Sequence, residues 1–469
     1  MNLLNKTIQK IDFVSDKTNI PIRRIKGIGG LSDILIKYMA ITKQTVPQKL
    51  KEAAIIACAD HGVAQMNVSA YPQKTTVDMT RNYLISKGAV ANAMTNFSAA
   101  DIFVVDMGIA ADMKNLTGLI NKKIALGTNN FVHGPAMSYK QAVKSLETGI
   151  DIANTLSQKG YNCFLLGEMG IANTTSSAAI AACICELPPE KSTGRGTNIS
   201  DNRLKIKMAV VKKALSINTP NPINGIDVLS KIGGFEFGCL AGIILGAAAN
   251  DRLVILDGFN TAAAALIAQA ICPASASHIM PSHLAGEPAH QAALKHLNLS
   301  PYIDLHLQLS ETAGSSVIAR FINLAVDLFN LSLHNNLPVF NKLPDDLSLK
   351  NIPLDKTVMK FCQERIDNLT KPINSLGKFE EIALYLSGAL QKPQPVMADI
   401  IKNNVLLMPY ILQISHCLKK PVTDTYIAKE VGFILIDGAL HMLNDMKTFA
   451  EAAVSVANDG PGSKKQKMF

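Results

Sequence analysis

Short apolar runs alternate with longer segments of helical periodicity over the first 330 or so residues of the chain. Runs of four to six apolar residues that end in glycine or polar residues are typical of buried strands, and the segments between them predict helices. Strands that alternate with helices predict right-handed βαβ units, and therefore an α/β fold with a doubly wound, mainly parallel sheet. The predicted strands are 53–58, 102–105, 163–166 and 253–256, and the main predicted helices are 80–97, 139–159 and 259–271.

Each predicted strand ends in a turn that contains glycine and polar residues. The turns are ADHG at 59–62, DMG at 106–108, GEMG at 167–170 and DGF at 257–259. In an open parallel sheet, ligands bind outside the carboxyl ends of the strands, and all four turns lie there. The pattern therefore predicts a Rossmann-like sheet with a ligand site along its carboxyl end.

The stretch GEMGIANTTSS at 167–177 is the strongest candidate binding segment. Its glycines leave backbone amides accessible, and polar side chains that include Asn173 and Thr174 follow them at the start of an alanine-rich helix. Backbone amides at a helix start suit an anion such as a phosphate. Glu168 would repel a phosphate but can accept hydrogen bonds from ribose hydroxyls. Phosphate and sugar at one turn indicate a nucleotide.

Two other clusters allow a catalytic or a structural interpretation. Asp60 and His61 can supply a general base or a metal pair, or they can fix the turn after their strand by hydrogen bonds. His283, Glu287 and His290 have helical spacing, but HExxH is absent, no third close ligand is present, and a proline interrupts the helix. We predict structural histidines and no metal site.

Glu311 lies in LQLSETAGSS at 307–316, between an apolar run and a helical one. In an apolar pocket its pKa would rise, and it would serve as a general base near neutrality. Alternatively, it stabilises the dipole of the helix that follows. The loop TGRGT at 193–197, followed by Lys205 and Lys207, is a candidate second contact for an anion.

The composition narrows the classes of protein further. The 469 residues are 48% hydrophobic but only 5% aromatic, which favours helices on a parallel sheet over a β-sandwich. The longest apolar run, 237–249, is shorter than the about 20 residues of a membrane span, so we expect a cytoplasmic protein. A net charge of +9 without a basic, aromatic stripe makes nucleic acid an unexpected partner. Eight cysteines without a CxxC pair predict buried free thiols.

Changes in composition along the chain predict three parts. A helical N-terminal segment covers 1–50, and an α/β catalytic domain covers 51–335. Residues 335–356 are rich in proline and lack clear periodicity, so they predict a linker. The helical patterns beyond them predict a C-terminal extension over 336–469.

Taken in order, the motifs resemble those of the nicotinate-nucleotide–dimethylbenzimidazole phosphoribosyltransferases, which activate the lower ligand of cobamides. The resemblance covers most of residues 25–330, and it depends on many ordered motifs rather than on any one of them. The matching motifs are ADHGV, VSAYP, VVDMGI, GTNNF, GPAM, GEMGIANTT, TGRGT, GGFEF, DGF, SHLAGEPAH and SETAG.

The resemblance implies a reaction between nicotinate mononucleotide and a lower-ligand base, 5,6-dimethylbenzimidazole or a related one. A base nitrogen attacks C1′, nicotinate leaves, and an α-riboside 5′-phosphate forms. Glu311 falls on the family's general base, which takes the proton from the attacking nitrogen. Other residues fall on positions near the ribose phosphate or on the base-binding wall, and no metal or cofactor is implied. These residues are Glu168, Gly170 and Lys207 for the nucleotide, and Ser69 and Tyr71 for the base. Met169, Asn173 and Thr174, in the same motif as Glu168, are further candidate contacts of the nucleotide.

The chain departs from the family pattern at several glycines. Ala172 and Asn198 stand where glycine is customary, and Ser310 and Ala313 replace part of a more glycine-rich pattern around Glu311. Each change restricts the backbone or narrows the pocket. These departures keep open the alternative of a non-catalytic or co-dependent subunit that needs a paralogous partner.

The ends of the chain also depart from the family. The segment LTKPINSLGKFEEIALYLSG at 369–388 is a close copy of one that family members typically carry at the N-terminus, so residues 349–469 look like a partial second copy. We expect a homodimer, or a heterodimer with a paralogue.

A nicotinamide-dependent oxidoreductase is a third hypothesis for the function. However, the glycines at 27–30 do not complete a dinucleotide-binding fingerprint.

Overall fold

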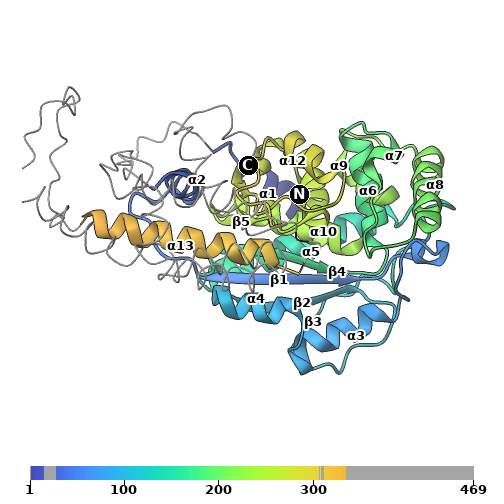
Figure 1. Cartoon of the computed structure of the whole chain (residues 1–469), viewed down its shortest axis with the longest axis horizontal. Helices are drawn as coiled ribbons and strands as arrows, with labels where there is room; N and C mark the ends of the chain where they lie inside the picture. The colour runs from blue at the N-terminus through green and yellow to red at the C-terminus, as the bar shows by residue number, and fades with distance from the viewer. Residues whose placement is uncertain (1, 15–27, 306, 308–310, 334–469) are drawn as a thin grey trace, which may run out of the picture. The chain divides into compact units, whose positions relative to one another are not determined.

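A six-stranded sheet forms the centre of the protein in the computed structural model, which describes residues 2–14, 28–305, 307 and 311–333. All strand pairs are parallel, and the order is β3-β2-β1-β4-β5-β6. Figure 1 labels the first five strands of the chain, β1 to β5. The predicted parallel α/β fold is confirmed. The predicted extension 336–469 and its boundary lie outside the described residues. The strands are β1 (Glu52–Ala59), β2 (Asp101–Gly108), β3 (Leu119–Asn121), β4 (Cys163–Met169), β5 (Leu253–Ile255) and β6 (Ile279–Met280).

Alternate residues of the central strand β1 enter cores on opposite faces of the sheet. Ile55 and Ala57 belong to the largest core, whereas Ala54 and Ile56 belong to two cores on the other face. Every residue of β1 is buried. A strand covered on both faces has no solvent side, which is why the sequence shows a continuous apolar run rather than an alternating one.

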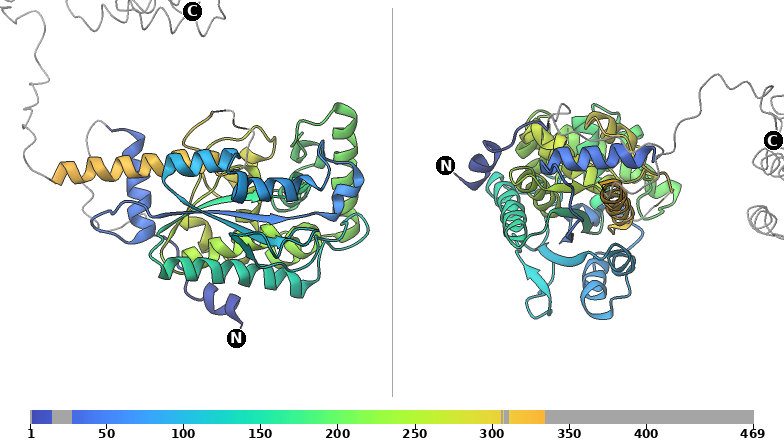
Figure 2. Two further views of the ribbon diagram at one scale, coloured as in Figure 1. Left: turned by 90° about the horizontal axis from the view of Figure 1, so that it is seen from below. Right: turned by 90° about the vertical axis from the view of Figure 1, so that its left-hand side faces the viewer.

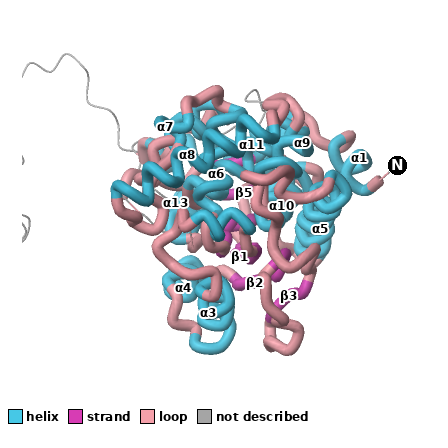
Figure 3. The backbone as a smooth tube through the Cα atoms, turned by 90° about the vertical axis from the view of Figure 1, so that its right-hand side faces the viewer, coloured by secondary structure: helices cyan, strands magenta, loops and turns pink. Residues whose placement is uncertain are grey.

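Helices cover both faces of the sheet, so the fold is doubly wound. Figure 3 shows α5 and α10 on one side of the strands and α4 and α13 on the other. The N-terminal helix α1 lies against α5 (Figure 2). The helices are α1 (Leu3–Ile8), α2 (Gly30–Thr42), α3 (Thr75–Arg81), α4 (Val90–Ser98), α5 (Tyr139–Gln158), α6 (Asn173–Ile184), α7 (Pro189–Ser192), α8 (Asp201–Asn218), α9 (Gly225–Ile232), α10 (Phe235–Ala248), α11 (Phe259–Ile271), α12 (His290–His296) and α13 (Ala313–Leu333).

Helices from distant parts of the chain build a second, smaller core beside the sheet. Tyr38 and Met39 of α2 pack there with Ile322 and Phe329 of α13. This packing fixes the direction of α13, which begins two residues after Glu311.

The prediction of one continuous helix over 80–97 is wrong, because this segment is helical in two separate pieces. The helix α3 continues into a π-helical turn, η2 (Asn82–Ser86), and then ends at Lys87, which has φ +52°. A new helix, α4, starts after Ala89. The side chain of Asn92 donates to the Tyr83 carbonyl and accepts from the Ala89 amide, so it joins the two pieces. The predictions for α5 and α11 are confirmed.

Candidate active site

The sheet reverses its winding direction between β1 and β4, and the two turns that follow these strands lie side by side. Such a switch point opens a crevice outside the carboxyl ends of the strands. Gly170, after β4, packs directly on β1, because a Cβ there would stand 2.2 Å from the Ala59 carbonyl oxygen. The two polar turns predicted from the sequence therefore meet at one place.

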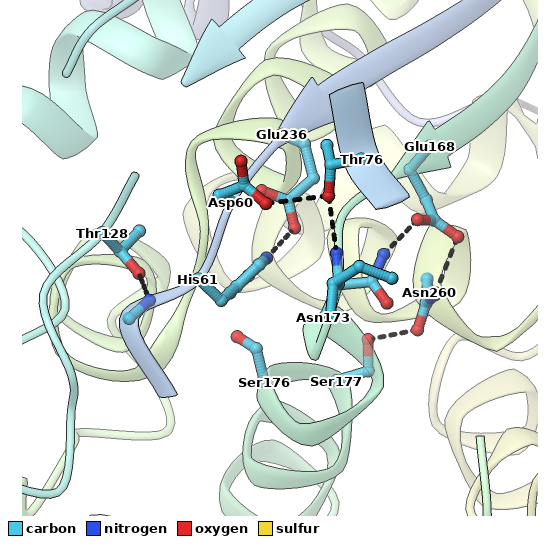
Figure 4. Close-up of polar contacts among 12 residues, drawn as sticks. Asp60, His61, Thr76, Thr128, Glu168, Asn173, Ser176, Ser177, Glu236 and Asn260 are labelled. Carbon is cyan, nitrogen blue, oxygen red and sulfur yellow. Dashed lines mark hydrogen bonds and ion pairs between the residues drawn. The ribbon is translucent and has the colours of Figure 1, made fainter. Parts of the chain in front are cut away.

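The turn after β4 leads directly into α6. Ala172 adopts a left-handed conformation with φ 75° and ψ 6°, and the helix begins at Asn173. The carboxylate of Glu168, at the end of β4, accepts a hydrogen bond from the Asn173 side-chain Nδ2 on one oxygen and from Asn260 Nδ2 at 2.7 Å on the other (Figure 4). Glu168 is thus held in one orientation beside the helix N-terminus, where an anion is favoured.

A buried lysine reaches the same helix from α8. The side chain of Lys207 is fully buried, and its Nζ donates to Thr174 Oγ1 at 2.8 Å and to the Gly194 carbonyl at 3.0 Å. Burial lowers its pKa to about 8, although the Glu287 carboxylate opposes this shift. The structure brings together three predicted parts of an anion site: the turn, the glycine loop and the lysine.

A cavity of about 370 Å³ opens beside these groups. A volume of this order suits a small-molecule ligand. Glu287 closes one side, where its Oε1 accepts from the Gly196 amide at 2.8 Å. Two other cations of the predicted anion contact have different surroundings. The Arg195 guanidinium donates to Asp201 and to the Ile199 carbonyl, and Lys205 is exposed. The lining comes from Thr174, residues 193–196, Asn198 and Leu204, residues 258–260, residues 285–288 and Leu307.

Glu311 approaches the same end of the sheet from the other side. Its Oε2 accepts from the Ala91 amide at 3.3 Å, in the first turn of α4. Burial raises its pKa, while the Ala91 amide and the Tyr83 hydroxyl oppose the shift. Both interpretations of this carboxylate therefore have support, but the helix that it approaches is α4 rather than the following α13.

Close packing ties the Glu311 segment to the end of β4. A Cβ on Gly167 would stand 2.8 Å from Thr312 Cγ2, and each of these residues is the direct neighbour of one of the two glutamates, Glu168 and Glu311. Asp257, after β5, accepts from the Ser315 amide at 2.9 Å and so anchors the start of α13. The sequence marked the turn that contains Asp257, but not this role.

The predicted base-binding residues differ in their surroundings. Ser69 Oγ lies 3.3 Å from Thr197 Oγ1, and the Ser69 carbonyl accepts from Arg203 at 2.8 Å. Ser69 is thus joined to the glycine loop, whereas the Tyr71 side chain is mostly exposed. Met169, at the end of β4, packs partly against the core formed with α4.

The turn after β1 is held by hydrogen bonds, as the structural interpretation of Asp60 and His61 required. Asp60 accepts from Thr76 Oγ1 and from the Ala110 amide, each at 2.8 Å. His61 Nε2 lies 2.5 Å from Glu236 Oε1 in a fully buried pair. Thr76 and Glu236 were missed, because each becomes a neighbour only through the fold. Among the described residues, no group of three histidine, cysteine or acidic side chains is placed to hold a metal ion.

Comparison with known proteins identifies the family of this chain. A family model described as phosphoribosyltransferase matches residues 13–334 and 352–408. The nicotinate-nucleotide–dimethylbenzimidazole phosphoribosyltransferase of Chloroflexus aggregans is 41% identical over 323 residues, which cover 67% of this chain and 91% of that protein. The chain belongs to this phosphoribosyltransferase family. The enzyme of the same name from Desulforamulus reducens is 39% identical over 340 residues, with 70% and 96% coverage.

A solved member of the family has the same fold. CobT from Thermus thermophilus aligns with a TM-score of 0.63 at 30% identity, covering 70% of this chain and 95% of that one. The second segment matched by the family model, 352–408, contains the copied stretch 369–388. None of the helices in the described part of the chain is long and apolar enough to cross a bilayer.

Proposed function

We propose that this phosphoribosyltransferase transfers the phosphoribosyl group of nicotinate mononucleotide to a lower-ligand base, 5,6-dimethylbenzimidazole or a related base. The products are an α-riboside 5′-phosphate for cobamide synthesis and nicotinate. The observation that carries the proposal is a buried lysine at the N-terminus of α6, packed at the same sheet end as a carboxylate of raised pKa. The first group suits a phosphate and the second suits a general base.

The nucleotide binds along β4 and α6. The amides at the start of α6 and the Lys207 ammonium contact the phosphate, and Gly170 lets the backbone approach. The side-chain amides of Asn173 and Asn260 orient the Glu168 carboxylate, which accepts from ribose hydroxyls. Thr174 is placed beside both the lysine and the cavity.

The base lies between the Ser69 segment and Glu311, with Tyr71 and Met169 at its edges. Its nitrogen lone pair forms the new bond to C1′, and the bond from C1′ to the pyridinium nitrogen of nicotinate breaks, with its electron pair going to nicotinate. Glu311 takes the proton from the attacking base. This transfer uses no cofactor.

The test is a panel of benzimidazoles, purines and phenols, each incubated with the full chain and nicotinate mononucleotide. Release of nicotinate and formation of a riboside phosphate with at least one base are expected. If no base releases nicotinate, the chain alone is not an active transferase. Activity that appears only after mixing with a paralogue would favour the co-dependent subunit, an alternative motivated by Ala172 and Asn198 in left-handed conformations. Pairing of chains and a cytoplasmic location stay predictions.

A further inference from the structure

The hydroxyl of Thr76 connects two parts of the site that come from different strands. It donates to Asp60 Oδ1 at 2.8 Å and accepts from the Ile171 amide at 3.2 Å. Thr76 is completely buried in the first turn of α3. Figure 4 shows its side chain between the turn after β1 and the turn after β4. A threonine hydroxyl can donate once and accept, and both functions are used here.

Asp60 gives this hydroxyl a fixed reference on the sheet. Its other carboxylate oxygen accepts from the Ala110 amide at 2.8 Å, beyond the end of β2. Its backbone amide donates to Gly108, and its carbonyl accepts from the Thr128 amide, each at 3.0 Å. Several hydrogen bonds therefore hold Asp60 in place, and its bond with Thr76 fixes the position of the Thr76 hydroxyl.

The Ile171 amide lies in the turn that places the nucleotide residues. The next residue, Ala172, is left-handed, and α6 begins directly after it with Asn173 and Thr174. A shift of Ile171 would move the start of this helix, and with it the side chain that contacts Lys207. The hydrogen bond to Thr76 is thus a restraint on the nucleotide turn.

Thr76 also ends the segment that carries the proposed base-binding wall. At the other end of this segment, Ser69 is joined to Thr197 and Arg203, which belong to the glycine-loop side. The segment is therefore attached at both ends to elements that hold the nucleotide. We propose that Thr76 is a positioning residue that aligns the base-binding segment 69–76 with the nucleotide turn 170–174. This inference rests on the proposed function, because alignment matters only if a base attacks C1′ of a bound nucleotide.

The test compares three variants of the full chain with the wild type. Thr76→Val keeps the shape but removes the hydroxyl, and Thr76→Ser restores it. Thr148→Val on α5 is the matched control, because Thr148 is also buried but its hydroxyl donates to the Lys144 carbonyl in its own helix. Circular dichroism fixes a temperature at which all three variants are folded.

At saturating concentrations of both substrates, we expect kcat to fall about tenfold or more in Thr76→Val, since a misplacement of about 1 Å can cost about 100-fold in rate. Thr76→Ser and Thr148→Val should stay within about threefold of the wild type, a margin far below that loss.

A second readout does not depend on activity. Hydrogen exchange at the Ile171 amide should be faster in Thr76→Val than in Thr148→Val, and slow again in Thr76→Ser. Equal kcat values for the two valine variants, or a serine variant as slow as Thr76→Val, would overturn the positioning role. If the wild type releases no nicotinate with any base, the proposed function fails. If exchange at the Ile171 amide is unchanged in Thr76→Val, the hydrogen bond between Thr76 and Ile171 is absent, and the positioning role is overturned.

Discussion

The proposed nucleotide half of the site (residues 167–177, residues 193–198 and Lys207) and the proposed base half (residues 69–76, Tyr83 and Glu311) hold their charged groups differently. In the nucleotide half, Glu168 accepts from two side-chain amides, and Lys207 donates to two oxygens. In the base half, Glu311 is only half-buried and accepts from the Ala91 amide at 3.3 Å. The nucleotide groups are therefore fixed before the substrate arrives, and Glu311 is held more loosely.

This difference matches what each half has to do. A binding group gains from being oriented in advance, because less freedom is lost on binding. A general base must accept a proton during the reaction, and donors that stabilise its charged form would lower its pKa. Burial with few donors leaves Glu311 with a raised pKa.

The largest effect is expected from Glu311→Gln. The amide keeps the size of the side chain but cannot take a proton, so kcat should fall about 10²- to 10⁴-fold, the range of a general base. The dissociation constant of nicotinate mononucleotide, measured by calorimetry, should change little, because the nucleotide half is untouched. The exposed Glu190 provides the control variant Glu190→Gln.

The pH profile tests the same carboxylate. Because burial raises the pKa of Glu311, the acid limb of kcat in the wild type should lie above the usual range of a glutamate. The residual activity of Glu311→Gln should lack that limb. An unchanged kcat in Glu311→Gln would remove this residue from the role of base.

A smaller loss is expected from Lys207→Gln, and in binding rather than in chemistry. Hydrogen bonds to a charged group contribute about 1.5–3 kcal/mol, so KM for the nucleotide should rise about 10- to 150-fold. The pKa of Lys207 is lowered to about 8, so its ammonium form is lost as pH rises through that value. KM of the wild type should therefore rise between pH 7 and 9.5, and KM of Lys207→Gln should stay flat.

Lys212→Gln, on the exposed side of the same helix, serves as the matched control. It should keep the KM of the wild type and its rise with pH. A fall in kcat without a rise in KM for Lys207→Gln would mean that the lysine does not bind the phosphate. Glu311→Gln is expected to lower kcat, and Lys207→Gln is expected to raise KM. These two variants therefore separate the halves of the site by the kinetic constant that each one changes.

The sequence predicted the parts of the site better than their connections. Buried strands and the long helices α5 and α11 follow from local apolar patterns, so they could be recognised. The contacts of Thr76 with Asp60 and Ile171 join three separate stretches of chain, and no local pattern records them. The break between α3 and α4 was missed for a similar reason, because the Asn92 side chain joins pieces that the apolar pattern ran together.

The smallest effect is expected from Ala172→Gly, although this residue is a clear departure from the family pattern in the nucleotide half. A left-handed alanine costs about 1–2 kcal/mol, which glycine would relieve. Against this, glycine loses about 0.8 kcal/mol from one buried methyl group and about 0.4–1 kcal/mol from the greater freedom of the unfolded chain. Ala172 is only 5% exposed, so the methyl term applies in full. The terms nearly cancel, and urea denaturation should show a change of about 0.5 kcal/mol or less in the free energy of unfolding.

Asn198→Gly is the matched variant for that comparison. Asn198 is left-handed too, with φ 59°, but asparagine tolerates this conformation. Both variants should keep kcat within about twofold of the wild type, because glycine can hold the same turn. A tenfold gain in kcat for Ala172→Gly alone would mean that the alanine distorts the nucleotide turn. That result would mean that the nucleotide half, rather than the base half, limits kcat in the wild type. It would favour a subunit that depends on a partner.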